Sequence, residues 1–327
     1  DAAEFLERVY ISRYANLKVG MTRYAVMCDE SGVIIDDGVV ARLGEQHFYF
    51  TTTTSGAAPI YRELTRLNTL WQLDCGLVNL TGAMAAMNLA GPKAAEVLAP
   101  LTVLDLSLTE FPYMAIREAT VAGIPARLMR VGFVGELGYE IHVPAAYANA
   151  LWEALWQSGN PYAMRAFGVE AQRLLRLEKG HIIIGQDTDG LTTPLEAGLN
   201  WALKMDKAFF IGQRSLQIVA RKPLAQKLTG FVLAAGYDGT VPQECHLIIE
   251  QGDIAGRITR IAWSPSMQRH IGLAFVRPYL AVANNVISLR LRAGSMTKAG
   301  IHPPPSHDPK NTRQQNPAHA LAPDTPY

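Results

Sequence analysis

The chain has 327 residues, of which 49% are hydrophobic and 18% are charged, and its formal net charge at pH 7 is +1. This composition is typical of a globular protein with about two domains, and the near-neutral charge argues against nucleic acid or an anionic membrane as a partner. No run of about 18 apolar residues is present, so no membrane span is expected. The three widely spaced cysteines, Cys28, Cys75 and Cys245, favour reduced thiols and a cytoplasmic protein.

The first part of the sequence predicts an antiparallel β-meander between two helices. Residues 2–10 have apolar side chains at helical spacing. Residues 23–28, 33–43 and 47–53 are rich in strand-forming residues and are separated by the turn-like segments DESG and GEQ. Residues 58–67 then return to a helical pattern.

From there to about residue 220, β-hairpins alternate with single helices. The dipeptide Ala122-Gly123 between two apolar stretches is a hairpin signal. The expected strands are residues 84–90, 115–121, 124–130 and 139–143, and the expected helices are residues 147–157 and 169–178. This pattern favours an α+β fold with antiparallel sheets over regular βαβ winding.

The texture of the sequence changes after Pro223. Five short strands, at residues 227–233, 246–251, 256–263, 271–275 and 286–291, predict a small β-barrel within residues 223–295. Residues 296–327 hold 7 of the 19 prolines and lack an aliphatic pattern. We therefore expect an extended tail there, disordered or draped on a partner.

An acidic doublet, Asp36-Asp37, interrupts the apolar β-stretch GVIIDDGVVARL. Successive side chains of a strand face opposite sides, and burying an unpaired carboxylate costs several kcal/mol. One interpretation is therefore a doublet at a strand end or bulge, with both acids in solvent. The other is a carboxylate held at a cleft, where it faces a developing positive charge, and the residues alone leave both open.

A glycine-rich loop precedes a strand that carries another acid. Gly132, Gly135 and Gly138 of VGFVGELGYEIHV lead into a strand and not a helix, which excludes a dinucleotide-binding fingerprint. We expect a tight loop that presents Glu136 and Glu140. Glu140 lies either on a solvated strand face or inside, where its carboxylate would accept two N–H donors of a planar heterocycle.

A third polar stretch, GQDTDGLTTP at residues 185–194, contains Asp187 and Asp189. Turn chemistry accounts for at least one of these acids. A calcium loop is excluded, because the positions that need a glycine and an acid hold Thr192 and Gly198. The eight histidines show no ligand spacing, so no metal site is expected.

Several stretches together resemble the folate-dependent aminomethyltransferase family, which includes the T-protein of the glycine cleavage system. They are GVIIDDGVVARL, FYFTTTTSGAA, MNLAGPKAAEVL, RVGFVGELGYEIHVP, RLEKGHIIIGQDTDGLTTPLEAGL and DKAFFIGQRSL. The resemblance runs from about residue 3 to residue 313. The stretches TTTTSGAA and EKGHIIIGQDTDG, with the TP that follows, are most similar to the T-protein-like C-terminal region of the alpha subunit of heterotetrameric sarcosine oxidase.

The resemblance implies α+β subdomains around a central channel that binds tetrahydrofolate, with a small C-terminal β-barrel. In this family a methylene unit, held as an iminium or aminomethyl group, is passed to the folate to give 5,10-methylenetetrahydrofolate. Asp37 matches the catalytic aspartate, which is expected to orient the folate amine and to stabilise the cation beside it. Tyr24 matches a tyrosine of the folate pocket, and Glu140 matches the glutamate that binds the pterin edge.

The chain also departs from the T-protein pattern. It has Phe133 where T-proteins have tyrosine, Gln172 where they have arginine, and His181 in place of another aromatic residue; we assign Phe133 and His181 to the cofactor pocket. The family begins roughly 60 residues before this chain, so residues 1–222 resemble an N-terminally truncated folate-binding region or a segment of a longer polypeptide. These departures fit a branch in which the methylene unit comes from amine oxidation.

We therefore expect a tetrahydrofolate-binding domain that captures the carbon of N-methyl amine (sarcosine-type) oxidation, together with other subunits of a flavin-dependent amine oxidase complex. The chain carries no flavin or NAD fingerprint of its own. The first alternative is the aminomethyltransferase of the glycine cleavage system. The second is a non-catalytic assembly domain of an oxidase complex.

Overall fold

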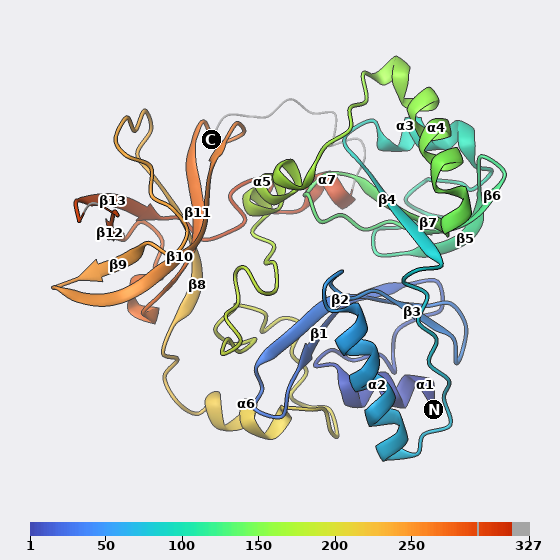
Figure 1. Ribbon diagram of the computed structural model, residues 1–327, viewed down its shortest axis with the longest axis horizontal. Helices are drawn as coiled ribbons and strands as arrows, with labels where there is room; N and C mark the ends of the chain where they lie inside the picture. The colour runs from blue at the N-terminus through green and yellow to red at the C-terminus, as the bar shows by residue number, and fades with distance from the viewer. Residues whose placement is uncertain (293, 316–327) are drawn as a thin grey trace. The chain divides into compact units, whose positions relative to one another are not determined.

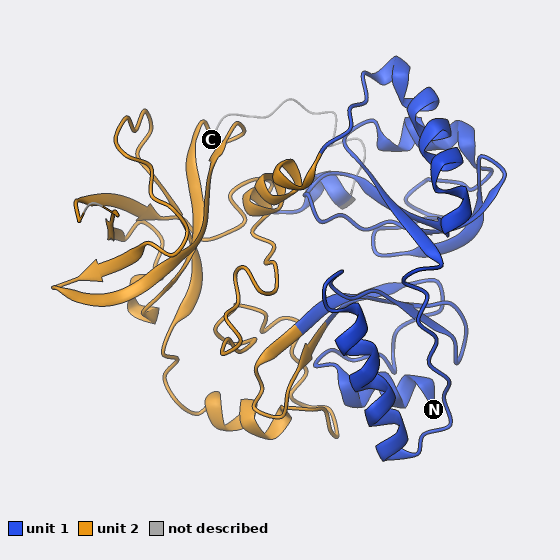
Figure 2. Ribbon diagram, in the orientation of Figure 1, with its two compact units in different colours: residues 1–25, 36–167, 310–327 blue, residues 26–35, 168–309 orange. Residues whose placement is uncertain are grey.

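The computed structural model describes residues 1–292 and 294–315. The chain forms two compact units, coloured blue and orange in Figure 2. The described residues of unit 1 are 1–25, 36–167 and 310–315, and those of unit 2 are 26–35, 168–292 and 294–309. Residues 168–222 group with the barrel in this division, and the boundary expected at residue 222 stays a prediction.

The N-terminal part of the chain forms a three-stranded sheet with the order β1-β2-β3 (Figure 1). Its elements are α1 (Ala2–Val9), β1 (Thr22–Cys28), β2 (Ile34–Arg42), β3 (Phe48–Phe50) and α2 (Ala57–Trp71). The predicted order of helix, three strands and helix is confirmed, with α2 reaching further than expected. The turn between β1 and β2 and the adjoining strand ends belong to unit 2.

Unit 1 also contains a four-stranded sheet with the order β4-β7-β6-β5, in which all neighbours are antiparallel. Its elements are β4 (Met84–Ala90), α3 (Ala94–Leu98), η1 (Ala99–Leu101), β5 (Ile116–Val121), β6 (Ile124–Met129), β7 (Gly138–Pro144), η2 (Ala145–Tyr147), α4 (Ala148–Gly159) and η3 (Asn160–Tyr162). The predicted hairpin joins β5 to β6. Its turn residues Ala122 and Gly123 have φ values of 51° and 76°, and a two-residue turn with positive φ at both positions matches the twist of the strands.

Helix α4 covers one face of this sheet. Alternate side chains of β7 pack against α4, and the side chains between them face the other way. Leu151 and Leu155, four residues apart, are buried in one cluster with Tyr139, Ile141 and Val143 of β7. Because strand residues alternate between faces, the residues between these three lie on the opposite side of the sheet.

Unit 2 is built around a closed barrel with the strand order β10-β11-β8-β13-β12-β9. Its elements are α5 (Val169–Lys179), α6 (Gln213–Val219), β8 (Lys227–Val232), β9 (Leu247–Glu250), β10 (Asp253–Ser264), β11 (Arg269–Val276), η4 (Pro278–Leu280), β12 (Val286–Arg290) and β13 (Met296–Ile301). The predicted barrel is confirmed, but the expected end at residue 295 is too early. Strand β13 closes the barrel by pairing with β12 and, at Gly300 and Ile301, with β8.

The segment after β13 packs on the end of α5. The backbone N–H groups of Ser306 and His307 donate to the carbonyl of Glu178 at 2.9 and 3.0 Å, and Lys179 forms a buried ion pair of 3.2 Å with Asp308. Residues 302–309 are therefore part of unit 2 and do not form the extended tail expected over residues 296–327. The rest of that predicted tail, residues 316–327, lies outside the described residues.

Substitutions in β13 will distinguish a barrel strand from a solvated tail. Ala299 is 3% exposed and packs inside the barrel, whereas the neighbouring Lys298 is exposed. Ala299→Asp buries an unpaired carboxylate and should lower the free energy of unfolding by about 3 kcal/mol or more. Lys298→Asp should lower it by less than about 1 kcal/mol. Chemical denaturation measures both, and equal small effects would show that this segment is not a barrel strand.

Candidate functional site

The two acids of the doublet on β2 have different partners. Asp36 is 3% exposed, and its Oδ1 accepts hydrogen bonds from Thr53 Oγ1 at 2.6 Å and from Thr53 N at 3.3 Å. A Cβ on Gly56, which precedes α2, would lie 3.0 Å from the same oxygen. Asp36 therefore stands at the N-terminus of α2, where negative charge is favourable. Burial raises the pKa of Asp36, and the hydrogen bonds from Thr53 oppose that rise.

Asp37 accepts a hydrogen bond of 2.6 Å from the Tyr24 hydroxyl to its Oδ2. Burial raises the pKa of Asp37 to about 6, the Tyr24 hydrogen bond opposes the rise, and the charge of Asp36 adds to it. The pKa of Tyr24 is also raised, chiefly by burial and then by Asp37, so the phenol keeps its proton and donates it. Both acids of the doublet are thus held by protein groups, which excludes a solvated strand end.

The chain around Tyr24 is fixed by the segment that follows α1. The carbonyl of Tyr24 accepts hydrogen bonds from Ser12 Oγ at 3.1 Å and from Tyr14 Oη at 3.3 Å. Tyr14 itself is fully buried. The backbone that carries this donor is therefore held by hydrogen bonds from two buried side chains.

Glu140 lies on β7 beside a buried histidine. Its side chain is 27% exposed, and its Oε2 is 3.5 Å from Nε2 of His142, whose side chain is 5% exposed. The Nδ1 atom of His142 lies 2.8 Å from the Tyr49 hydroxyl on β3. His142 was not among the predicted site residues, although residues two apart on a strand share a face. Tyr49 was not among them either, and it is 93 positions away from His142 in the chain.

Strand alternation directs the side chains of Asp37 and Glu140 into the layer between the two sheets of unit 1. Asp37, Val39 and Ala41 share one face of β2, and Val39 and Ala41 pack in an apolar cluster with Met129. Met129 pairs with Glu140 in the ladder between β6 and β7, so these two also share a face. Both carboxylates thus face the layer between the two sheets, and within the described part of the chain no hydrogen bond joins them.

The other two predicted pocket residues lie in the loop before β7 and after α5. Phe133 is half-buried in the loop between β6 and β7. His181 follows α5 in unit 2, where its N–H donates to the carbonyl of Arg176 at 3.0 Å and its own carbonyl accepts from Arg176 Nη1 at 2.8 Å. The assignment of Phe133 and His181 to a cofactor pocket stays a prediction.

The glycine-rich loop before β7 is held by the short helix α7 (Thr312–Gln315). Arg313 forms an ion pair of 2.8 Å with Glu136. The side chain of Gln314 donates to the carbonyl of Gly132 at 2.7 Å and accepts from the Tyr113 hydroxyl at 3.1 Å. The sequence analysis assigned this segment to the tail, because a four-residue polar helix has no apolar periodicity to detect.

The acids of the stretch at residues 185–194 serve the fold of unit 2. Asp187 is fully buried; its Oδ2 accepts from Arg176 and, at 2.8 Å, from the N–H of Ile183, and its Oδ1 accepts from Thr259 Oγ1 at 2.6 Å. Asp189 accepts a hydrogen bond of 3.1 Å from the backbone N–H two residues on, as expected for turn chemistry. Asp187 thus ties α5 to strand β10.

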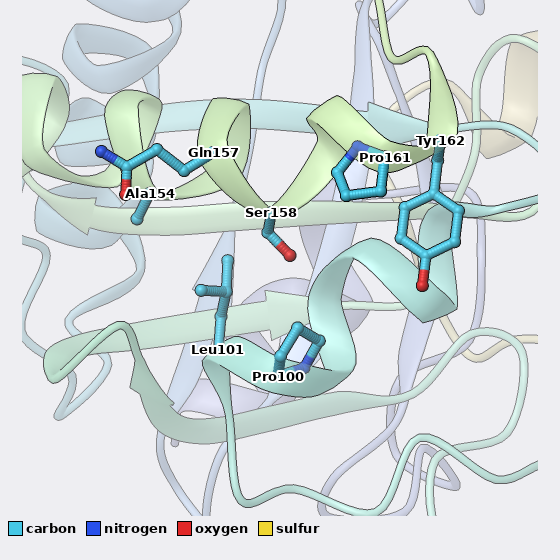
Figure 3. A pocket seen from close by; sticks show the side chains of 7 residues that line it. All are labelled: Pro100, Leu101, Ala154, Gln157, Ser158, Pro161 and Tyr162. Atoms are coloured by element: carbon cyan, nitrogen blue, oxygen red, sulfur yellow. The ribbon is translucent and has the colours of Figure 1, made fainter.

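A hollow in unit 1, between η1 and the end of α4, contains none of the predicted site residues (Figure 3). Its lining residues are Pro100, Leu101, Ala154, Gln157, Ser158, Pro161 and Tyr162. Across residues 1–292 and 294–315, no three His, Cys, Asp or Glu side chains gather in a way that would hold a metal ion. In the same part of the chain, no helix has both the length and the apolar character needed to cross a membrane.

Two family models match the chain. The GCVT N-terminal domain matches residues 1–207, and the glycine cleavage T-protein C-terminal barrel domain matches residues 226–308. The second match includes β13, in agreement with the six-stranded barrel.

The chain is also similar to individual proteins of two kinds. Sarcosine oxidase subunit alpha from Corynebacterium sp. (strain P-1) is 40% identical over 293 residues, which make up 85% of this chain and 30% of that protein. An aminomethyltransferase from Halothermothrix orenii is 32% identical over 296 residues, or 90% of this chain and 81% of that protein. The crystal structure of glycine cleavage system aminomethyltransferase T from Bartonella henselae matches with a TM-score of 0.83 at 26% identity, covering 94% of this chain and 81% of that one. The chain thus spans about a third of the sarcosine oxidase subunits that it matches.

The raised pKa of Asp37 predicts a pH-dependent stability difference between the wild type and Asp37→Asn. Between the unfolded pKa of 3.8 and the folded value of about 6, the folded protein binds more protons than the unfolded chain, so stability falls as pH rises through this window. Asp37→Asn removes this loss and should be more stable than the wild type by up to about 3 kcal/mol at pH 7, with no such gain at pH 3.5.

Urea denaturation at several pH values measures this difference, and Asp189→Asn is the control of opposite sign. Although partial burial opposes it, hydrogen bonds from Thr192 and Arg257 lower the pKa of Asp189. Asp189→Asn should therefore lose stability above about pH 4. A pH-independent difference for Asp37→Asn would mean that its carboxylate is not desolvated.

Proposed function

Because this chain belongs to the glycine cleavage T-protein (GCVT) family, we propose that it binds tetrahydrofolate beside Asp37 and Glu140 and captures, as 5,10-methylenetetrahydrofolate, the methylene unit released by sarcosine-type N-methyl amine oxidation. The observation that carries the proposal is the combination of burial, raised pKa and a single side-chain hydrogen bond at Asp37. This carboxylate is largely desolvated, has a pKa of about 6 and accepts a hydrogen bond from one side chain, Tyr24. An ionised carboxylate has about four acceptor positions, so Asp37 keeps acceptor capacity for a ligand.

Glu140 fits the edge of the pterin that carries the N–H donors, and Asp37 fits the end that carries the reacting nitrogen. The amino group and ring N–H groups of the pterin edge are adjacent donors, and an ionised carboxylate binds such a pair through both oxygens. Glu140 offers a partly exposed carboxylate whose neighbouring imidazole nitrogen is 3.5 Å away. Its oxygens are therefore available to donors from a ligand.

When bound, the reduced folate supplies the nucleophilic amine nitrogens that take up the one-carbon unit. Asp37 holds a negative charge where positive charge develops, and Tyr24 fixes the direction of that carboxylate. Pre-oriented charge in a site from which water is excluded is commonly the largest contribution to catalysis. With a pKa of about 6, Asp37 is ionised at neutral pH and is also able to accept a proton.

The sarcosine oxidase branch is favoured over the glycine cleavage branch as the source of the carbon. Identity is 40% to the sarcosine oxidase subunit and 32% to the aminomethyltransferase. Gln172 and Phe133 replace the arginine and tyrosine expected in a T-protein. Since the chain spans 30% of the sarcosine oxidase subunit, we assign the oxidation of the amine to other parts of a flavin-dependent complex and its partner subunits.

Asp37→Asn should abolish methylene transfer and leave tetrahydrofolate binding within about threefold of the wild type, because the amide keeps the shape and loses the charge. Formation of 5,10-methylenetetrahydrofolate, coupled to sarcosine oxidation in the whole complex, measures transfer. Asp189→Asn in unit 2 is the control and should transfer normally. Undiminished transfer by Asp37→Asn would remove Asp37 from the mechanism.

Glu140→Gln should weaken tetrahydrofolate binding at least about tenfold, or about 1.4 kcal/mol, because an amide offers one acceptor oxygen where the pterin edge needs two. Isothermal titration calorimetry measures the affinity. Glu153→Gln, at an exposed acid of α4, is the control. An unchanged affinity would move the pterin away from Glu140.

The alternative functions predict other results in the same assays. The 81% coverage of an aminomethyltransferase motivates a test with an aminomethylated lipoyl carrier protein, and release of ammonia from that carrier would favour glycine cleavage. A non-catalytic assembly domain would give no heat with tetrahydrofolate.

A further inference from the structure

A buried histidine beside Glu140 has no role in the function proposed above. The His142 side chain is 5% exposed and lies between two groups from different sheets. Its Nδ1 is 2.8 Å from the Tyr49 hydroxyl, and its Nε2 is 3.5 Å from Glu140 Oε2. We infer that His142 carries a proton on Nε2 and positions the Glu140 carboxylate for its ligand. The inference rests on the proposed ligand-binding role of Glu140.

Tyr49 selects the tautomer of His142. Burial raises the pKa of Tyr49, Arg127 opposes the rise and Glu140 adds to it, so the phenol keeps its proton at ordinary pH. The guanidinium of Arg127 lies over the Tyr49 ring, 4.6 Å from its centroid. The Tyr49 hydroxyl directs its proton to Nδ1 of His142, because the opposite arrangement would turn the lone pair of Nε2 toward the Glu140 carboxylate oxygen 3.5 Å away. A neutral imidazole that accepts at Nδ1 carries its proton on Nε2.

This tautomer aims a buried N–H at Glu140. The Nε2 atom has no hydrogen-bond partner within the described residues, and leaving a buried donor unpaired is costly. Glu140 is partly exposed and needs to move only a few tenths of an ångström for Oε2 to come within hydrogen-bond distance. That hydrogen bond would fix one carboxylate oxygen and leave the remaining acceptor positions directed at the ligand.

His142 is a positioning residue and not a catalytic one, because its buried side chain acts through Glu140. A carboxylate held in its bound orientation loses less conformational entropy when a ligand binds. Supporting groups of this kind keep a binding residue within a fraction of an ångström of the productive geometry. One hydrogen-bonded group on β3 and β7 would thus be formed by Tyr49, His142 and Glu140.

Two substitutions separate the two nitrogens of the imidazole. His142→Gln keeps an N–H donor near the place of Nε2, and His142→Asn keeps a polar group only near Nδ1. Calorimetry with tetrahydrofolate should show His142→Asn binding about tenfold more weakly and His142→Gln within about threefold of the wild type. In a Glu140→Gln background, His142→Asn should cause no further loss, because residues that act as one unit are not additive.

Equal affinities of the wild type and His142→Asn would overturn the inference. So would an undiminished effect of His142→Asn in the Glu140→Gln background. Thermal unfolding of each variant identifies one that fails to fold.

A measurement on the ligand-free wild type tests the inference independently of folate. Ring ¹⁵N chemical shifts of His142 should show the Nε2–H tautomer, and Tyr49→Phe should redistribute the proton between the two nitrogens. An Nδ1–H tautomer in the wild type would overturn the inference even if tetrahydrofolate binds. Absence of tetrahydrofolate binding, with the Nε2–H tautomer present, would overturn the proposed function and leave the imidazole oriented as inferred.

Discussion

The hydrogen bond from the Tyr24 hydroxyl to the Asp37 carboxylate governs what the acidic site can do. Burial of Asp37 disfavours its charge, and the neighbouring Asp36 disfavours it further. The phenol is the side chain that opposes both effects, and with its hydrogen bond in place the pKa of Asp37 is about 6. A weaker hydrogen-bond donor at this position would disfavour the ionised form of Asp37. An arginine would neutralise the carboxylate, and a ligand cation would then gain little from binding beside it.

Side chains alternate between the two faces of β2, and this gives Asp36 and Asp37 different surroundings. Asp36 faces Thr53 and the N-terminus of α2, where it holds the TTTTSG segment in place. Asp37 faces the layer between the sheets, where Glu140 also points. A single extended strand thus gives adjacent acids different surroundings, one at the N-terminus of α2 and one at the proposed ligand site, and a slip of the pairing by one residue would exchange them.

Strand-forming residues bounded by turn-like segments were sufficient to predict the strands that carry the site, β2 and β7. The resemblance of short stretches to a known family supplied the roles of Asp37, Tyr24 and Glu140, which spacing alone left open. Strand β13 was missed because the prolines that follow it dominate the composition of residues 296–327. The contact between His142 and Tyr49 was missed because it joins residues 93 positions apart, and no local pattern encodes such a pair.

Comparison of two buried aspartates shows why burial alone does not identify a functional acid. Asp187 is fully enclosed, and it accepts hydrogen bonds from Arg176, Thr259 and the N–H of Ile183. Its negative charge is neutralised by a guanidinium and its oxygens are used, so it has little to offer a ligand. Asp37 is less buried, has no cationic partner among the described residues and accepts from a single phenol. A buried negative charge without a full set of partners lowers the stability of the fold. A protein tolerates this cost where a ligand supplies the missing partner.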